Sequence, residues 1–264
     1  PNGLDSKIPK KPFSITLALT DKLDTLVGFF GINQKPTSSK DPYALRRSAL
    51  SVIRLLVENN KEFKIKDLIN YSTSLHRDKG FELSNESLQK ELIEFLLDRL
   101  KYYMKEKKIR VDIVNASINS HGIDHLDKIY RKALTLNNVI NKKIGEDIVS
   151  SYKRAANILD NELKDKQFEL SNATDSGIFQ NDFEKNLLKK INELKKYFIN
   201  INKDEDYMQT LTNLADAKKV IYEFFDNVKV NDEDKNIKKN RLELLQMLCK
   251  TFDNYINFSS IESN

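Results

Sequence analysis

Glycine and proline are scarce in this chain, at 7 and 5 of its 264 residues. Such low counts leave few breaking residues for the many turns of a sheet. Charged residues make up 31% and hydrophobic residues 39%, with lysine and glutamate common, which suits long helices and argues against disorder throughout. We therefore predict an all-α protein, with enough residues for one large helical domain or two smaller ones.

Cysteine and long apolar runs are also rare. Cys249 is the single cysteine, so an intramolecular disulfide is excluded and a reducing compartment, the cytoplasm, is expected. No apolar run approaches the roughly 18 residues that a membrane-spanning helix needs, so no membrane is predicted among the partners. The chain starts with Pro1 and a loop-like segment and has no signal-like segment. We expect a domain taken from a longer protein.

Motifs that carry chemistry are missing. The sequence contains no G-x-x-x-x-G-K-[ST], G-x-G-x-x-G, G-x-S-x-G or H-E-x-x-H pattern. The histidines are His76, His121 and His125; the last two are four residues apart, but Gly122 lies between them and no further ligand accompanies them. A zinc site needs three or four well-placed ligands. We therefore predict neither catalytic residues nor a metal site in this chain.

Apolar residues recur at helical spacing along most of the chain. We predict helices over about 13–30, 42–58, 67–76, 84–103, 111–120, 124–142, 145–163, 179–198, 207–225 and 236–258. Gly31 is placed to end the first helix as its C′ residue, and Asp41 and Pro42 have the chemistry of the N-cap and first residue of the second. In that second helix, Arg47 and Arg54 share the face opposite the apolar positions.

The net charge of +5 and the pI of about 9.0 permit RNA binding without requiring it, so local clusters must decide. In the helix over 145–163, Lys153 and Asn157 lie one turn apart on the side opposite the apolar face, with Arg154 on the flank. A basic residue and an amide on one ridge can contact a phosphate and a base edge. The alternative, which spacing alone favours, is a solvated helix face.

The last predicted helix contains an arginine, Arg241, in the middle of its apolar stripe. A charge that faces a core must be paired, because arginine does not readily lose its proton. We predict a partly buried ion pair, with Asp226 at the end of the preceding helix as the partner. The alternative is that Arg241 reaches a groove in which RNA docks.

Four blocks of the sequence resemble a known family. They read IPKKPFSITLALTDKLDTLVGFFGI from Ile8, KDPYALRRSALSVIRLLVEN from Lys40, YKRAANIL from Tyr152 and EFFDNVKVNDEDKNIKKNRLELLQML from Glu223. In this order they resemble the beta subunit of the bacterial heterotetrameric glycyl-tRNA synthetase, with weaker similarity over 61–144. The resemblance implies the C-terminal two-fifths of that subunit.

The resemblance implies three segments. Residues 1–58 correspond to the C-terminal part of an HD-type domain, 59–122 to connecting helices, and 123–264 to an anticodon-binding helical bundle of the arginyl-tRNA synthetase (DALR) type. Turn-forming residues at 119–122 agree with the second boundary. In the family, an alpha2beta2 heterotetramer joins glycine to tRNA-Gly with ATP and Mg2+ in the alpha subunit, while the beta subunit binds tRNA. The resemblance therefore implies tRNA-Gly and the alpha subunit as partners of a ligase part that holds no cofactor itself.

The resemblance and the helix patterns together select candidate RNA contacts. These are Lys153, Arg154 and Asn157 in the third block, Lys238, Lys239 and Asn240 in the fourth, and Arg47 and Arg54 for the body of the tRNA. The chain departs from the family pattern at Lys229 and Asn231, where methionine is common, and at Lys238, where arginine is common. A lysine keeps the positive charge and loses the bidentate geometry of arginine.

Two other functions remain open from the sequence. One is a helical subunit-assembly module without RNA affinity, which predicts a large exposed apolar patch. The other is a metal-dependent phosphohydrolase, because Asp21 matches the last acidic position of an HD motif. The histidines of that motif lie outside this chain, so the phosphohydrolase is disfavoured.

Overall fold

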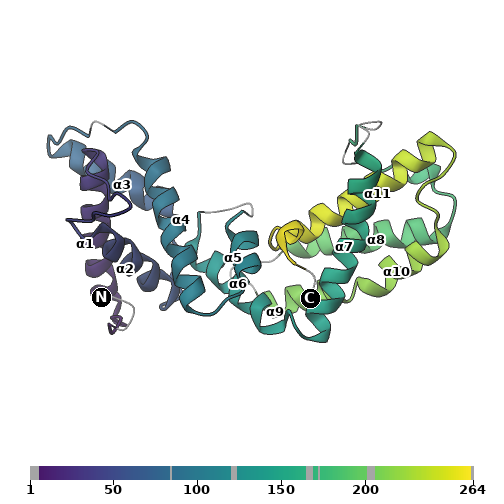
Figure 1. The fold of residues 1–264 in the computed structure, drawn as a ribbon, viewed down its shortest axis with the longest axis horizontal. Coiled ribbons are helices and arrows are strands. Elements are labelled where there is room, and N and C mark those ends of the chain that lie inside the picture. The colour runs from purple at the N-terminus through teal and green to yellow at the C-terminus, as the bar shows by residue number, and fades with distance from the viewer. Residues whose placement is uncertain are drawn as a thin grey trace. The chain divides into compact units, whose positions relative to one another are not determined.

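The computed structural model of the chain describes residues 6–83, 85–119, 124–164, 169–171, 173–200 and 206–262. All regular elements in these ranges are helices, as predicted (Figure 1). The chain forms two compact units, unit 1 from 1–114 and 122–131 and unit 2 from 115–121 and 132–264. The division passes through α5 (Val111–Ile118) and α6 (Leu126–Val139), so each of these helices belongs partly to both units.

Unit 1 is built mainly from α1 (Pro12–Gly31), α2 (Leu45–Val57), α3 (Ile65–Asp78) and α4 (Leu88–Glu106). α1 packs against the other three, and α4 also contacts α2 and α3. The centre of the core consists of side chains that are 0% exposed: Leu26, Val27, Ala49, Val52, Ile53, Leu56, Leu92, Leu96 and Leu100. These residues recur at helical spacing, so the apolar pattern that predicts the helices is also the surface that holds them together.

The first residue of α2 is Leu45 rather than Pro42. The Asp41 carboxylate still caps the helix, because it accepts hydrogen bonds from the backbone N–H groups of Leu45 at 2.8 Å and Arg46 at 3.0 Å. Ala44 takes a left-handed φ of 54° directly before the helix. The N-cap residue is therefore Ala44 and not Asp41 as predicted, and Pro42 lies in the turn before the helix; the Asp41 carboxylate caps the first turn from three residues before the N-cap.

The end of α1 also differs from the prediction. Gly31 is the last helical residue, and the left-handed φ of 59° that follows belongs to Asn33. Gly31 is needed for space instead, since a Cβ atom at this position would lie 2.5 Å from Cδ2 of Leu83. The glycine allows a close approach of the segment before α4 to the end of α1.

Unit 2 contains α7 (Lys143–Leu163), α8 (Asp182–Asn200), α9 (Tyr207–Ala215), α10 (Lys218–Asn227), α11 (Lys235–Asp253), and the 3-10 turns η1 (Ser176–Ile178) and η2 (Phe258–Ser260). α7 packs against α9, α10, α11 and η2, and α8 packs against α10 and α11 (Figure 1). The apolar side chains of unit 2 that are 0% exposed include Ile148, Ala155, Leu187, Ile191, Leu211, Leu214, Ile221, Phe224, Leu244, Leu245 and Phe252. α7 is thus the helix on which the unit is assembled.

The largest differences from the predicted helices of unit 2 concern the last two. The helix predicted over 207–225 is two helices, since α9 ends at Ala215, α10 begins at Lys218, and Ala217 between them is fully buried. No glycine or proline marks this bend, so the sequence does not reveal it. α11 ends at Asp253, before the predicted end, and the carboxylate of Asp253 accepts a hydrogen bond from the Phe258 N–H at 2.9 Å to shape the turn into η2.

The predicted domain bounds at 58 and 122 can be compared with the two units. Residues 6–58 and 59–114 lie in the same compact unit, so residue 58 is not a boundary between units. The boundary at 122 falls where the chain passes between units, although 120–123 lie outside the described residues. The three-segment division itself stays a prediction.

The described ranges contain no helix that combines the length and apolar character needed to cross a membrane. They also contain no group of three or more His, Cys, Asp and Glu side chains placed to hold a metal ion. Among the histidines, His76 Nε2 lies 3.1 Å from Asp24 Oδ1, and His121 falls outside the described residues.

Candidate nucleic-acid interface

α7 carries the first block of predicted RNA contacts. Its buried residues are Gly145, Ile148, Ser151, Tyr152, Ala155 and Leu159. Lys153 is half-buried, and Asn157, one turn later on the same side of the helix, is exposed. Neither of these two side chains has a hydrogen bond or an ion pair with another residue in the described ranges. Their polar groups are therefore available for a phosphate and a base edge.

Arg154 is held by α10. Its Nη2 donates to Asp226 Oδ1 at 3.3 Å, and its guanidinium carbon lies 4.9 Å from the ring centre of Tyr222 and 4.6 Å from that of Phe225. The arginine side chain remains 36% exposed. A cation over an aromatic ring gains about 0.5–1 kcal/mol at an exposed site, and a guanidinium plane is a surface on which a base can stack. Arg154 thus combines a structural contact with an accessible face.

Tyr222 and Phe225 were not predicted as functional residues from the sequence. Their signal is present in retrospect, because Tyr222, Phe225 and Asp226 have the i, i+3, i+4 spacing that places three side chains on one helix face. Nothing in the sequence pairs that face with α7. The pairing is a tertiary contact between segments about seventy positions apart, as the hydrogen bond from Arg154 to Asp226 shows.

A second contact fixes α10 against α7. Lys218 Nζ lies 2.7 Å from Asp147 Oδ1, and Lys143 Nζ lies 3.0 Å from the same atom. Burial acts to raise the pKa of Asp147, but the hydrogen bonds from Lys218 and Lys143 outweigh it and hold the pKa below its ordinary value. The hydrogen bond to Asp147 in turn raises the pKa of Lys218. The two ends of the contact between α7 and α10 are therefore both charged and paired.

The two lysines near the start of α11 differ in whether their charge is paired with another side chain. Lys238 Nζ lies 2.6 Å from Glu162 Oε2 of α7, and the two side chains are only 15% and 24% exposed. Lys239 is half-buried and has no hydrogen-bond or ion-pair partner among the described residues. The charge of Lys239 is thus available to a nucleic acid, whereas that of Lys238 mainly joins two helices.

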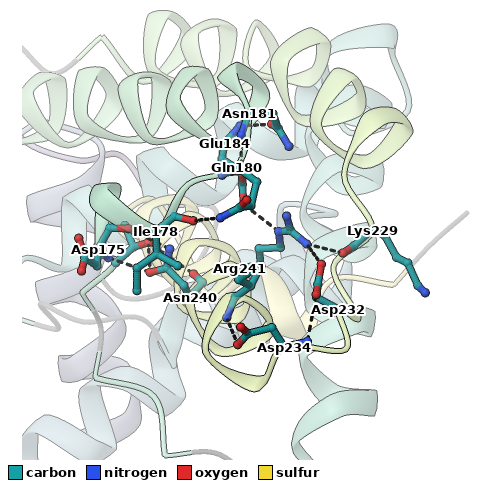
Figure 2. A network of polar contacts seen from close by, with 12 residues as sticks. Asp175, Ile178, Gln180, Asn181, Glu184, Lys229, Asp232, Asp234, Asn240 and Arg241 are labelled. Carbon is teal, nitrogen blue, oxygen red and sulfur yellow. Dashed lines mark hydrogen bonds and ion pairs between the residues drawn. The ribbon is translucent and has the colours of Figure 1, made fainter.

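Asn240 is a structural residue, which corrects its prediction as an RNA contact. It is 4% exposed. Its Oδ1 accepts from Asp175 N at 2.7 Å and from Thr174 Oγ1 at 2.8 Å, while its Nδ2 donates to Asp175 O at 3.0 Å (Figure 2). These bonds fix the segment before η1 to α11, so the Asn240 side chain is buried and serves the packing of unit 2.

Arg241 forms the predicted buried ion pair, but with other partners. Its Nε donates to Glu184 Oε1 at 2.7 Å, and its Nη1 donates to Asp232 Oδ2 at 2.7 Å and to the backbone oxygen of Lys229 at 2.9 Å (Figure 2). Asp226, the predicted partner, pairs with Arg154. The prediction chose an acid at the end of the preceding helix, whereas Asp232 comes from the loop between that helix and α11, and Glu184 comes from α8, which packs on α11.

The two arginines predicted to contact the body of the tRNA lie in unit 1 and differ in exposure. Arg47 is exposed. Arg54 is 5% exposed; its Nε donates to Glu58 Oε1 at 2.7 Å and its Nη2 to the backbone oxygen of Ser6 at 2.8 Å. Arg54 is therefore part of the packing of unit 1, and its prediction as an RNA contact is wrong. The helical spacing places both on one face, but the segment before α1 covers only Arg54.

Comparison with known proteins places both units in a family. The family model described as glycyl-tRNA synthetase beta subunit matches residues 1–119, and the model described as DALR anticodon binding domain matches residues 148–262. The second match contains α7, α10 and α11, with all the candidate RNA contacts outside unit 1.

Curated relatives agree with the family models. The glycine–tRNA ligase beta subunit of Rickettsia prowazekii (strain Madrid E) is 35% identical over 258 residues, which is 98% of this chain and 36% of the relative. Those of Rickettsia africae (strain ESF-5) and Ruegeria sp. (strain TM1040) are 35% and 32% identical, over 99% of this chain and 37% and 36% of their own lengths. The chain thus spans little more than a third of these relatives. It belongs to the glycyl-tRNA synthetase beta-subunit family and carries a DALR anticodon-binding domain over residues 148–262.

Proposed function

We propose that residues 148–262 bind the anticodon arm of tRNA-Gly and recognise its anticodon, as one part of a glycine–tRNA ligase. The observation that carries the proposal is the surface of α7 within the DALR match. Lys153 and Asn157 present polar groups that have no hydrogen-bond or ion-pair partner among the described residues, and Arg154 lies beside them with its guanidinium over two aromatic rings. Charge, an amide and a stacking surface are the elements that single-stranded RNA recognition uses.

The whole enzyme's activity belongs to the same proposal. In it, the alpha subunit of an alpha2beta2 heterotetramer joins glycine to tRNA-Gly with ATP and Mg2+, in the cytoplasm, and this chain contributes tRNA binding. The absence of a nucleotide-binding or catalytic motif from the sequence is consistent with that division of labour. Lys153, Arg154, Asn157 and Lys239 form the RNA-binding set in this proposal, with Lys238 and Arg47 as outer phosphate contacts.

The direct experiment measures binding of the 264-residue chain to tRNA-Gly and to a transcript with a changed anticodon, each at two salt concentrations. The expected result is tighter binding of tRNA-Gly at both salts, with affinity for both RNAs falling as salt rises because phosphate contacts release counterions. Equal affinity for the two transcripts would remove the anticodon-reading claim. No measurable affinity for either RNA would overturn tRNA binding as a whole.

Matched lysine variants test the α7 surface itself. Lys153→Ala removes a charge that no described residue pairs, so it should weaken binding and lower the slope of log affinity against log salt by about one. Lys219→Ala removes a charge on α10 whose side chain is 83% exposed and lies 3.9 Å from Glu223, and it is the control. If Lys153→Ala and Lys219→Ala change RNA affinity and its salt dependence equally, the α7 surface does not contribute specifically to binding.

The assembly module remains the second candidate, and one observation favours it. Unit 1 exposes large apolar side chains near a groove of about 340 Å3 between α1 and α3: Phe13 is 79% exposed, Leu17 62% and Tyr71 67%. An apolar surface of this kind is typical of a site that another protein covers. This alternative predicts association with the glycyl-tRNA synthetase alpha subunit and no RNA affinity in this chain, so the tRNA titration above distinguishes the two.

A further inference from the structure

Unit 2 contains a pocket of about 480 Å3 that none of the predicted RNA contacts lines. Its lining comes from α6, α8, α9 and the turn after α11: Lys132, Lys195, Phe198, Ile199, Tyr207, Thr210, Asn254 and Tyr255. The volume lies within the range of about 300–1,000 Å3 that is usual for small-molecule sites. Because the lining residues come from four separate segments, no local sequence motif predicts this site.

The floor of the pocket is aromatic and rigid. Tyr207 and Tyr255 are 7% and 1% exposed, and their ring centres lie 6.4 Å apart in an edge-to-face arrangement. The Tyr255 hydroxyl donates to the backbone oxygen of Lys132 at 3.0 Å, which fixes the ring relative to α6. At the rim, Phe198 is half-buried and Ile199 is 79% exposed. Three aromatic rings and an isoleucine therefore line the cavity.

The polar groups of the pocket are cationic or neutral. Lys132 Nζ lies 5.7 Å from the ring centre of Tyr255, Lys195 lines the opening from α8, and Asn254 is exposed at the edge. The described lining residues include no carboxylate. Of the neighbouring acids, Asp253 accepts from the Tyr152 hydroxyl at 3.2 Å and Asp206 accepts from Gln209 N at 2.9 Å. The lining thus suits a flat ligand that carries negative charge.

We propose that this pocket binds an unpaired nucleotide of the RNA. The base lies between Phe198 and the tyrosine floor, the amide of Asn254 meets its edge, and Lys195 and Lys132 contact the flanking phosphates. Stacking on aromatic side chains with lysines along the backbone is how proteins hold unpaired bases. An apolar peptide segment would use the same rings but gains nothing from two lysines. The inference rests on the proposed tRNA binding and adds a second point of contact to the α7 surface.

Neighbouring residues provide matched controls for the pocket variants. Lys195→Ala removes a lining charge, whereas Lys196→Ala removes an exposed charge from the next position of α8, outside the lining. Phe198→Ala removes a lining ring, whereas Tyr197→Ala removes a half-buried ring that does not line the pocket. All four positions lie in α8. Equal urea midpoints of the two variants in each pair would exclude a difference in folding.

The tRNA-Gly affinity of each variant is the first readout. Phe198→Ala should weaken binding about tenfold, as expected for the loss of one base-stacking contact. Lys195→Ala should weaken it about threefold or more and lower the salt dependence, whereas both controls stay within about twofold of the original chain. Pocket variants that bind like their controls would overturn the pocket proposal, and the proposed function would stand if the original chain still prefers tRNA-Gly.

A fluorescent base gives the second readout. 2-Aminopurine is placed at one position of the tRNA-Gly anticodon loop at a time, and at least one position should be quenched on binding by stacking against the rings. That quenching should disappear in Phe198→Ala and persist in Tyr197→Ala. If no position shows quenching that depends on Phe198, the pocket does not hold a base of this loop and the proposal fails. If the original chain does not bind tRNA-Gly at all, the proposed function and the pocket assignment fail together.

Discussion

Arg241 and Glu184 form a buried ion pair that joins α11 to the first turn of α8, with Nε and Oε1 2.7 Å apart and the two side chains 5% and 1% exposed. The other oxygen of Glu184 accepts from the backbone N–H groups of Gln180 at 2.7 Å and Asn181 at 3.1 Å. Asp232 accepts a hydrogen bond from Nη1 of the Arg241 guanidinium. A pair with several hydrogen bonds on both partners offsets the cost of burying its charges, so the bundle depends on both residues.

Removal of the arginine alone should therefore be costly. Arg241→Met leaves the Glu184 carboxylate buried without its cation, and we expect a loss of about 3–5 kcal/mol in the free energy of unfolding, measured by urea denaturation. Arg241→Met combined with Glu184→Gln should recover part of that loss, because no unpaired charge remains. A single variant as stable as the original chain would show that the ion pair does not hold these helices. Loss of RNA binding by a folded, stable Arg241→Met protein would instead support the groove-contact alternative.

Asn240 and Lys239 are neighbours with opposite expected effects. Asn240→Ala removes three hydrogen bonds to Thr174 and Asp175, so it should lower the free energy of unfolding by about 2–3 kcal/mol. At a temperature where the variant stays folded, its affinity for tRNA-Gly should be unchanged. Lys239→Ala should do the reverse, with a stability change within about 0.5 kcal/mol and weaker RNA binding. A folded Asn240→Ala protein that loses RNA affinity would contradict the structural role.

Glu58 should make the stability of unit 1 depend on acid pH. Burial acts to raise its pKa, but the hydrogen bond and charge of Arg54 outweigh burial and hold the pKa below its ordinary 4.5. A depressed carboxyl pKa stabilises the folded state above 4.5, and this contribution is lost as the pH falls through the folded-state value. The stability difference between the original chain and Glu58→Gln should therefore be greatest near neutral pH and shrink below 4.5. Glu106→Gln, at an exposed position of α4, is the control. A pH-independent difference for Glu58→Gln would exclude this linkage.

Cys249 should be unreactive in the folded chain. Its side chain is buried at 7% exposure, and burial, with the nearby charges of Asp253 and Asp160, raises the pKa of the thiol to about 12. Only the thiolate is a good nucleophile, so reaction with a disulfide reagent at pH 8 should be slow in the native protein and rapid in guanidinium. Because Cys249 is the only cysteine, the rate reports on unit 2 alone. Fast modification without denaturant would mean that the end of α11 opens readily.

Much of the fold follows from the order of the residues. The 3.6-residue recurrence of apolar side chains predicted the helices of both units, because the same side chains must be buried together. A capping role for the Asp41 carboxylate was also predictable, since a carboxylate just before an apolar pattern can accept from free N–H groups, but the turn that makes Ala44 the N-cap residue was not. The bend at Ala217 was not predictable, because a buried alanine is as compatible with a continuous helix as with a break between two helices.

The sequence by itself also determined the family, because long ordered blocks of residues identify it without coordinates. It further determined that Arg241 needs a buried partner, since an apolar stripe around an arginine leaves the charge no access to water. Tertiary structure alone decided which acid that partner is, and it showed that Arg54 and Asn240 are buried while Lys153 and Asn157 remain accessible. Helix periodicity gives the direction of a side chain relative to its own helix. What covers it depends on contacts between segments far apart in the chain, and these appear only when the helices pack.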